Sequence, residues 1–390
     1  MTNEKSKMKS VVLLLIKICL LVVAFFFVSK QVTWQDTIIE KSGKVHTGKI
    51  ISGFDSKDAK TLMIEREDGR KRTISTSEVA KRSFGIKTTF AKLSPMNYAF
   101  GMLLIFCMYC FGIARWRALL AVQGINASYG RAFRLTFVGF FWNNLMPGMT
   151  GGDVPKAVLI AKDSPGRRSE AVSTVIIDRV IGLAALAMLS AVAILSNFSK
   201  FREQGYVVFG VLGICLIVFV CFFSRRVRRR LRISDILNKL PLSGILKKLD
   251  AAFHGYRSSP KTLVFAIVVS GLAHICNICA VFVFGSDLGM NIPLVTYFAA
   301  VPIIFIASSI PLFPGGWGVR EYAFITVFMM VGVDPAYKSN LVILSVILGL
   351  SMMAWSLLGG IFLFIGRKDG EIPVEMKEDD WNEDPVNEKA

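Results

Sequence analysis

The sequence contains few of the residues from which most enzyme active sites and metal sites are built. Three histidines occur in 390 residues, and His46, His254 and His274 lie far apart along the chain. Paired histidine and carboxylate ligands, a Ser-His-Asp arrangement and a nucleotide-binding glycine loop are all missing from the sequence. The sequence therefore predicts no catalytic residue, no metal and no cofactor.

Cysteine is absent from the part of the chain where disulfides would form. All seven cysteines lie in apolar segments, and none lies in the polar block 31–92. The pairs Cys107–Cys110 and Cys276–Cys279 have the spacing of zinc ligands, but cysteine in an apolar helix is usually a small packing residue. We expect no disulfide framework.

Charged residues are scarce at 19%, whereas 53% of the residues are hydrophobic, which is typical of a membrane protein. Six apolar runs are long enough to cross a bilayer. They are residues 11–28, 96–114, 171–196, 206–223, 262–285 and 341–365. The first run could be a signal peptide, but no small-residue cleavage site follows it, so a retained anchor span is favoured.

The net charge of +18 would suit a nucleic-acid partner, but its distribution argues against one. Basic residues collect at the ends of apolar runs, as the positive-inside rule predicts. This pattern places both termini in the cytoplasm. The cluster Arg225–Arg230 precedes an amphipathic stretch and is expected to contact the anionic cytoplasmic leaflet, with topological anchoring alone as the alternative.

The chain divides into four predicted parts. Residues 1–30 form an N-terminal membrane anchor span, and residues 31–92 form a β-rich extracytoplasmic insertion. Within that insertion, four short strands flank turns at Ser42-Gly43 and Asp68-Gly69. Residues 93–368 form the transmembrane domain, and the acidic tail 369–390 is expected to be disordered.

Two further apolar segments, 133–161 and 293–333, are interrupted by glycine and proline. The first has basic residues on both sides, and the second has almost none. If basic flanks lie in the cytoplasm, both flanks of the first segment are inside and both flanks of the second are outside. This predicts two helical hairpins that enter from opposite faces, although two full crossings would also suit the second segment. Interruptions at corresponding positions are typical of an inverted-repeat transporter with its binding site near the midplane. The predicted fold is an all-α polytopic membrane protein with about six full spans and two re-entrant or broken hairpins.

The interruptions supply the candidate site residues. Proline and glycine break the helices, and the resulting half-helix ends offer free N–H groups to an anion such as a phosphate. The predicted hairpin breaks are Pro147, Gly151, Gly152, Pro311, Pro314, Gly315, Gly316 and Gly318. Polar residues near them, together with an ionisable pair inside a span, are predicted to bind a lipid head group. They are Asn143, Asn144, Asp153, Lys156, Asp178, Arg179, Arg320 and Glu321.

Two alternatives remain open for these residues. Asp153 either caps the following half-helix or pairs with a cation. Asp178 and Arg179 either serve function or form internal ion pairs that link helices.

Three motifs, in this order, carry a family resemblance. They read Asn143-x-x-x-Pro147-x-x-x-Gly151-Gly152-Asp153-x-x-Lys156, then Asp178-Arg179, then Pro314-Gly315-Gly316-x-Gly318-x-x-Glu321. Over about residues 96–367 the chain resembles the lysylphosphatidylglycerol synthase transmembrane-region family, whose members are flippase-like. The chain departs from the family pattern at Lys156, where arginine is common, and at Asp178, where glutamate is common. The block 31–92 is an insertion.

The resemblance implies a bacterial inner-membrane protein that moves a phospholipid or lipid-linked substrate between leaflets. No aminoacyl-transferase domain follows Lys368, so we expect no synthase activity. A membrane-embedded enzyme that modifies a lipid head group is one alternative. An accessory protein of an envelope assembly, docked through 31–92, is another. Homo-oligomerisation stays open.

Overall fold

The computed structural model describes most of the chain outside its two ends. The described residues are 35–52, 61–66, 69–83, 85, 88, 93–144, 152–196, 198–199, 201–223, 255–256, 258–309 and 316–365. Several predictions fall outside them: the anchor span 11–28, the cluster Arg225–Arg230, the tail 369–390, and the break residues Pro147, Gly151, Pro311, Pro314 and Gly315.

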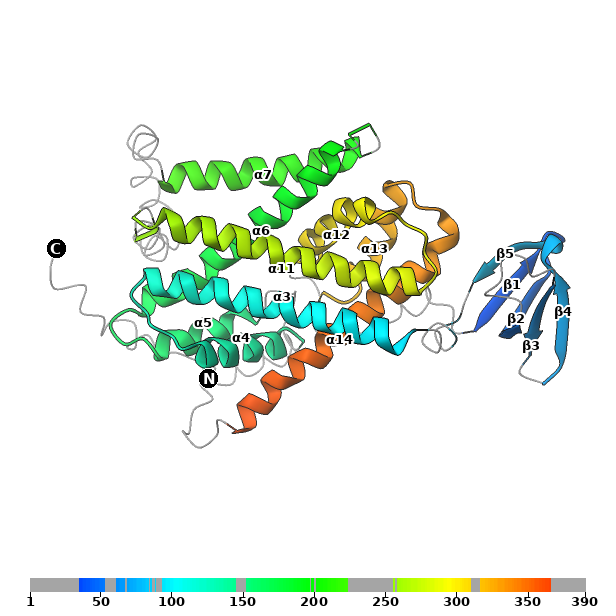
Figure 1. The fold of residues 1–390 in the computed structure, drawn as a ribbon, viewed down its shortest axis with the longest axis horizontal. Helices are drawn as coiled ribbons and strands as arrows, with labels where there is room; N and C mark the ends of the chain where they lie inside the picture. Colours follow the sequence, from blue (N-terminus) through cyan, green and yellow to red (C-terminus); the bar gives the residue numbers. More distant parts are fainter. Residues whose placement is uncertain are drawn as a thin grey trace, which may run out of the picture.

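Long apolar helices make up the body of the molecule (Figure 1). Among the described residues, four helices are long and apolar enough to cross a membrane. They are α3 (Pro95–Val122), α6 (Arg168–Ser196), α11 (Pro260–Asp287) and α14 (Lys338–Ile365). At 1.5 Å per residue each is about 42 Å long, which exceeds a hydrocarbon core of about 30 Å. A fifth apolar helix, α7 (Arg202–Phe223), runs beside α6.

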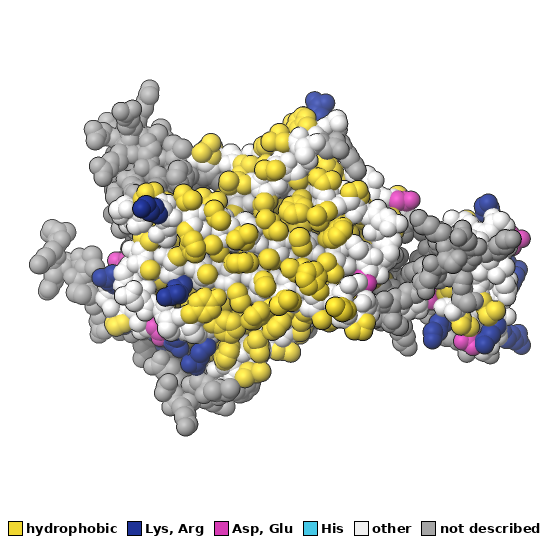
Figure 2. All heavy atoms as spheres, viewed as in Figure 1, with side chains coloured by type: hydrophobic (Ala, Val, Ile, Leu, Met, Phe, Trp, Pro, Cys, Tyr) yellow, Lys and Arg dark blue, Asp and Glu magenta, His cyan; other side chains and the backbone are white. Residues whose placement is uncertain are grey.

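The outward faces of these helices carry large apolar side chains, and Figure 2 shows a broad apolar surface over the bundle. One exposed example from each of the five long helices is Leu103, Val192, Ile214, Val268 and Ile361. Apolar patches of this extent are rare on soluble monomers, because water does not solvate them favourably. The structure is therefore that of a helical membrane protein.

Helices α3 and α11 form an antiparallel pair that is joined at one end by polar contacts. Asp287, the last residue of α11, accepts hydrogen bonds from the Ser94 backbone N–H at 2.6 Å and from the Asn97 side chain at 2.7 Å. Ser94 is the N-cap of α3, and Pro95 follows it at a first-turn position that needs no N–H partner. Near that end Gly101 faces the Phe284 ring, so the two backbones approach closely.

Four shorter helices occupy the two interrupted segments. They are α4 (Tyr129–Asn143), α5 (Asp153–Lys162), α12 (Leu294–Ser308) and α13 (Val319–Met330). The longest has 15 residues and measures about 22 Å, so none of the four crosses a membrane alone.

The pair α4 and α5 and the pair α12 and α13 pack against opposite halves of the long helices (Figure 1). In α14, Ser345 in the first half contacts Glu321 of α13, whereas Gly359 in the second half lies against the backbone of α4. In α6, Arg179 in the first half contacts α5, and Ser190 in the second half donates to a carbonyl of α12. The two broken segments therefore approach the middle of the bundle from its two ends.

A small antiparallel sheet precedes the helices, at the end of the bundle where α3 begins (Figure 1). Its strands are β1 (Asp36–Glu40), β2 (Val45–Ser52), β3 (Thr61–Glu65), β4 (Lys71–Ser75) and β5 (Val79–Ser83), in the order β4-β3-β2-β1-β5. Five residues form its core on one face: Ile38, Ile50, Leu62, Ile64 and Ile74. Gly43 and Gly69 have φ values of 84° and 76°, as the predicted tight turns require.

The fifth strand was not among the four predicted strands. Residues 79–83 read Val-Ala-Lys-Arg-Ser, with too few apolar residues to show the alternation of a half-buried strand. They pair with β1, some 40 residues earlier in the chain, as shown by Ile38 opposite Arg82. That long-range partner leaves no local sequence signal.

The backbones of α4 and α5 touch at two glycines. A Cβ atom added to Gly152 would overlap the carbonyl oxygen of Gly139 and lie 2.8 Å from the side-chain oxygen of Asn143. The same Asn143 oxygen accepts the Gly152 N–H at 2.5 Å. Only glycine allows this approach, so Gly152 is required for the close contact between α4 and α5.

We expect Gly152→Ala to separate α4 from α5 and to destabilise the protein by about 1–3 kcal/mol, the usual cost of overpacking a close contact. The measurement is the thermal unfolding midpoint of the purified protein in detergent. Gly130→Ala is the matched control, because Gly130 also lies in α4 but an added Cβ there meets nothing within 4 Å. Equal midpoints for the two variants would contradict the predicted contact.

Candidate functional site

A cavity of about 290 Å³ lies between the two pairs of short helices. Its wall includes residues from α3, α4, α5, α6, α11 and α14, together with residues beside the break between α12 and α13. Seven of the eight predicted head-group residues line it: Asn143, Asn144, Asp153, Lys156, Asp178, Arg179 and Arg320. The fold thus brings residues from distant parts of the chain to one space inside the bundle.

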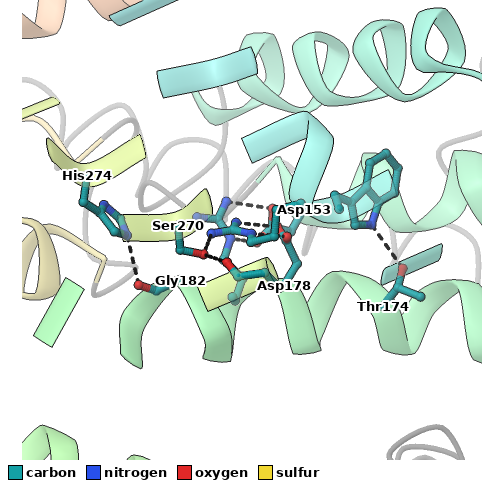
Figure 3. A network of polar contacts seen from close by, with 10 residues as sticks. Asp153, Thr174, Asp178, Gly182, Ser270 and His274 are labelled. Atoms are coloured by element: carbon teal, nitrogen blue, oxygen red, sulfur yellow. Dashed lines mark hydrogen bonds and ion pairs between the residues drawn. The ribbon is translucent and has the colours of Figure 1, made fainter. Parts of the chain in front are cut away.

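The first ion pair in the wall joins α3 to α6. Arg115 donates to both carboxylate oxygens of Asp178, through Nε at 2.6 Å and Nη2 at 2.9 Å. Its remaining Nη1 donates to the Ser270 hydroxyl of α11 at 2.9 Å. Figure 3 shows Asp178 and Ser270 lying close together, with dashed lines marking these contacts. The two-pronged geometry is the strongest that arginine forms with a carboxylate, so three helices are held together here.

The second ion pair joins α5 to α6. Arg179 donates to Asp153 through Nε at 2.5 Å and Nη2 at 2.8 Å. Gly152 is the N-cap of α5, and Asp153 is the first residue after it, so the Asp153 carboxylate serves the ion pair rather than a cap hydrogen bond. Asp178 and Arg179 are neighbours in sequence, but they form ion pairs with residues on different helices.

Lys156 is the cation in the wall that has no carboxylate of its own. It is buried, at 6% exposure, and its Nζ lies 3.7 Å from the centre of the Trp116 ring. Within the described part of the chain, neither an ion-pair partner nor a hydrogen-bond partner reaches this ammonium group. Trp116 is itself fixed, because its indole N–H donates to Thr174 at 3.1 Å (Figure 3). The ring face attracts the ammonium group but does not neutralise it.

A third ion pair lies at the second break. Arg320 and Glu321 are each 2% exposed, and they pair at 2.9 Å. Glu321 also accepts from the Ser345 hydroxyl at 2.8 Å and from the Gly318 N–H at 2.5 Å. Both of its oxygens are thereby occupied. Unlike the other seven predicted residues, Glu321 does not line the cavity; it caps α13 and holds Arg320 in the wall.

Glycines make room for these side chains at the second break. Gly316 and Gly318 have φ values of 72° and 84°, in the left-handed region that side chains disfavour. On α14, a Cβ atom added to Gly349 would overlap the Arg320 guanidinium. The arginine also stacks on the Trp317 ring at 4.6 Å, so each break places a cation over an indole.

The two asparagines at the end of α4 have separate partners. Asn143 accepts from Gly152 across the break, as described above. Asn144 donates to the Ser356 hydroxyl of α14 at 2.7 Å. Their side chains line the cavity and hold the end of α4 to its neighbours.

Sequence reasoning missed several residues of the wall. Arg115 directly follows the predicted apolar run 96–114, but α3 continues to Val122, so the arginine lies inside the helix. The other missed wall residues are single polar positions in apolar helices and carry no motif: Thr136, His274 and Asn277. Among the described residues, no group of three histidine, cysteine or acidic side chains is placed to hold a metal ion.

These features define a class of protein: a helical membrane protein with a charged internal cavity at paired helix breaks. The chain belongs to the family described as the lysylphosphatidylglycerol synthase TM region, whose model matches residues 79–345. The match covers more than half of the chain and includes every residue of the predicted site.

Several relatives of this chain are archaeal membrane proteins. A UPF0104 membrane protein of Pyrococcus horikoshii is 24% identical over 311 residues, which are 73% of this chain and 92% of the relative. One from Methanothermobacter thermautotrophicus is 23% identical and covers 65% of this chain and 81% of the relative. One from Methanocaldococcus jannaschii is 26% identical over 59% of this chain and 95% of the relative.

We expect Arg115→Gln to destabilise the protein strongly, because it leaves the Asp178 carboxylate buried without its cation. Breaking a buried pair in this way typically costs about 3–5 kcal/mol. Arg131→Gln is the matched control, since Arg131 pairs with Asp163 where both side chains are about one-third exposed, and such pairs contribute about 0–1 kcal/mol. Chemical unfolding of both variants in detergent measures the difference. A loss at Arg115 no greater than at Arg131 would show that the inner pair is solvated.

Proposed function

We propose that this protein is a lipid translocase that moves a phospholipid or lipid-linked head group between leaflets through its internal cavity. The observation that carries the proposal is Lys156, a buried cation without a carboxylate partner, in a cavity between two broken helix pairs. A buried ammonium group without hydrogen-bond acceptors is costly unless a partner reaches it. A head-group phosphate is such a partner.

The charges around the cavity support an anionic ligand. Arg115, Arg179 and Arg320 are matched by Asp178, Asp153 and Glu321, and Lys156 is the fourth cation. The described charges at the site therefore sum to one positive charge in excess. One phosphodiester carries one negative charge, so its entry would leave the site neutral.

The helix arrangement supports passage between leaflets. We infer that α4 with α5, and α12 with α13, are re-entrant hairpins of an inverted repeat, entering from opposite faces. Their lengths and their positions at opposite ends of the bundle favour this topology. A cavity that both hairpins border would open alternately to either leaflet, with the acyl chains remaining in the lipid.

The charge distribution favours one orientation. Arg117, Arg131 and Lys261 lie at the end of the bundle where α3 ends, and Asp287 and Asp334 lie at the end near the sheet. We place the basic end in the cytoplasm of a bacterial inner membrane, which puts the sheet and its block 31–92 outside. Figure 2 shows the apolar surface between these two ends.

A transporter is favoured over a lipid-modifying enzyme because the acidic groups at the cavity are already engaged. Asp153, Asp178 and Glu321 each give both oxygens to guanidinium, hydroxyl or backbone donors. Ion pairing stabilises the charged form of a carboxylate and so weakens it as a base. The membrane phospholipid is thus proposed as cargo.

We expect Lys156→Met to abolish most lipid exchange while leaving the fold intact, since methionine keeps the volume and removes a buried charge. Charge-assisted hydrogen bonds contribute about 1.5–3 kcal/mol, so exchange should fall roughly 10- to 100-fold. The measurement is dithionite quenching of acyl-labelled phospholipid in proteoliposomes. Lys156→Arg, which retains the cation, should keep a substantial part of the rate.

Lys162→Met is the control, because Lys162 ends the same helix and does not line the cavity. Wild-type exchange no faster than in protein-free vesicles would refute the translocase proposal. Equal rates for Lys156→Met and Lys162→Met would refute the role of Lys156.

A further inference from the structure

A groove of about 460 Å³ lies on the outer surface of the bundle, where α3 ends and α11 begins (Figure 1). None of the residues that line it also lines the inner cavity. The lining residues are Ala118, Ala121 and Val122 of α3, together with Ser259, Lys261, Thr262 and Phe265 at the start of α11. The groove is therefore separate from the site described above.

The walls of the groove are fixed by packing. Val122 packs on a cluster in which Leu119 and Tyr256 are fully buried. The Tyr256 hydroxyl donates to the Leu119 carbonyl at 2.9 Å, which joins the chain before α11 to the end of α3. On the α3 side, Ala118 and Ala121 have small side chains and leave the space between the helices open. The groove is thus part of the folded protein.

The groove is polar at one end and apolar at the other. Lys261 is exposed, and no carboxylate among the described residues pairs with it. Ser259 is the N-cap residue of α11, but its side chain makes no cap hydrogen bond. Its hydroxyl is therefore available beside the Thr262 hydroxyl. Further along α11 the lining becomes apolar at Phe265, which is 46% exposed.

This change in polarity matches the depth of the groove in a membrane. Helix α11 has 28 residues and is about 42 Å long, whereas a hydrocarbon core measures about 30 Å. When the excess is shared between the two ends, about four residues at each end lie at head-group level. Lys261 and Thr262 fall within that stretch of α11. Phe265 falls beyond it, among the exposed apolar side chains of Val264 and Val268.

We infer that the groove holds a resident anionic phospholipid from the leaflet at the basic end of the bundle. The phosphate contacts the Lys261 ammonium group and the hydroxyls of Ser259 and Thr262, and one acyl chain lies between the α3 alanines and the Phe265 ring. An anion is favoured because the lining residues include a cation and no acidic group. Such a lipid links the end of α3 to the start of α11. The inference requires only that the chain spans a membrane, so it does not rest on the translocase proposal.

The role of the cation is tested by Lys261→Met. Native mass spectrometry of the purified full-length protein in detergent measures binding of phosphatidylglycerol and phosphatidylcholine with identical acyl chains. We expect the wild-type protein to bind phosphatidylglycerol more tightly, and Lys261→Met to lose about fivefold in affinity for it, as one basic residue near an anionic lipid contributes. Lys162→Met is the matched control, because Lys162 ends α5 and does not line the groove. Its affinity should stay unchanged.

The place of the acyl chain is tested by Ala121→Phe. Ala121 is exposed, so the larger side chain fits without displacing α3 and occupies the groove instead. A phospholipid with a photoreactive acyl chain should label residues 118–122 and 259–265 in the wild-type protein and lose this labelling in Ala121→Phe. Val264→Phe adds the same ring to the exposed surface outside the groove, so labelling should persist in that variant.

Binding at the groove is distinguished from binding in the inner cavity by repeating the measurements in a Lys156→Met background. A Lys261 effect that persists there supports the groove, and one that disappears overturns the assignment. Equal losses for Lys261→Met and Lys162→Met overturn it too, because they would show general charge attraction. Labelling that Ala121→Phe leaves unchanged also contradicts it. Groove binding in a protein without lipid exchange supports the resident site and refutes only translocation.

Discussion

The clustering of seven charged groups inside an apolar helical bundle, four of them buried, is the constraint on which the rest of the structure depends. Charges in a low-dielectric interior are tolerated only where each has a partner, and breaking a pair costs more than the pair contributes. Arg115, Arg179 and Arg320 meet this constraint by pairing two-pronged or through several donors. The Arg115 and Arg179 pairs each join two helices, and the Arg320–Glu321 pair of α13 contacts α14 through Ser345.

The broken helices follow from the same constraint. Non-helical backbone at membrane depth must be buried in protein or border a polar space, because lipid offers no hydrogen bonds. Here Asn143 and Glu321 bond the backbone N–H groups of Gly152 and Gly318. The glycines allow close approach or a left-handed conformation, and the carboxylate that caps α13 also orients Arg320. Structure and binding surface therefore depend on the same side chains.

The proposed binding site is formed by the polar groups that these three ion pairs do not include. With three carboxylates committed to arginines, Lys156 is held by an aromatic ring, and Thr136 and Asn277 face the cavity unpartnered. A site with one cation in excess is complementary to an anionic head group. The broad apolar outer surface is what would keep the acyl chains of such a ligand in lipid while its head group lies inside (Figure 2).

The amino-acid sequence by itself determined the membrane class, the long helices and the positions of the interruptions, because hydropathy, charge asymmetry and glycine-proline clusters are local properties. It also identified seven of the residues that line the cavity, since ionisable residues in apolar segments stand out. Only the tertiary structure decided the pairings: Asp178 and Arg179 are neighbours in sequence yet bind Arg115 and Asp153. It likewise placed Glu321 behind the wall, paired Val79–Ser83 with β1, and brought Arg115, Thr136 and Asn277 to the site. Those contacts join residues far apart in the chain, and single polar residues in a helix carry no pattern that reveals which neighbour they face.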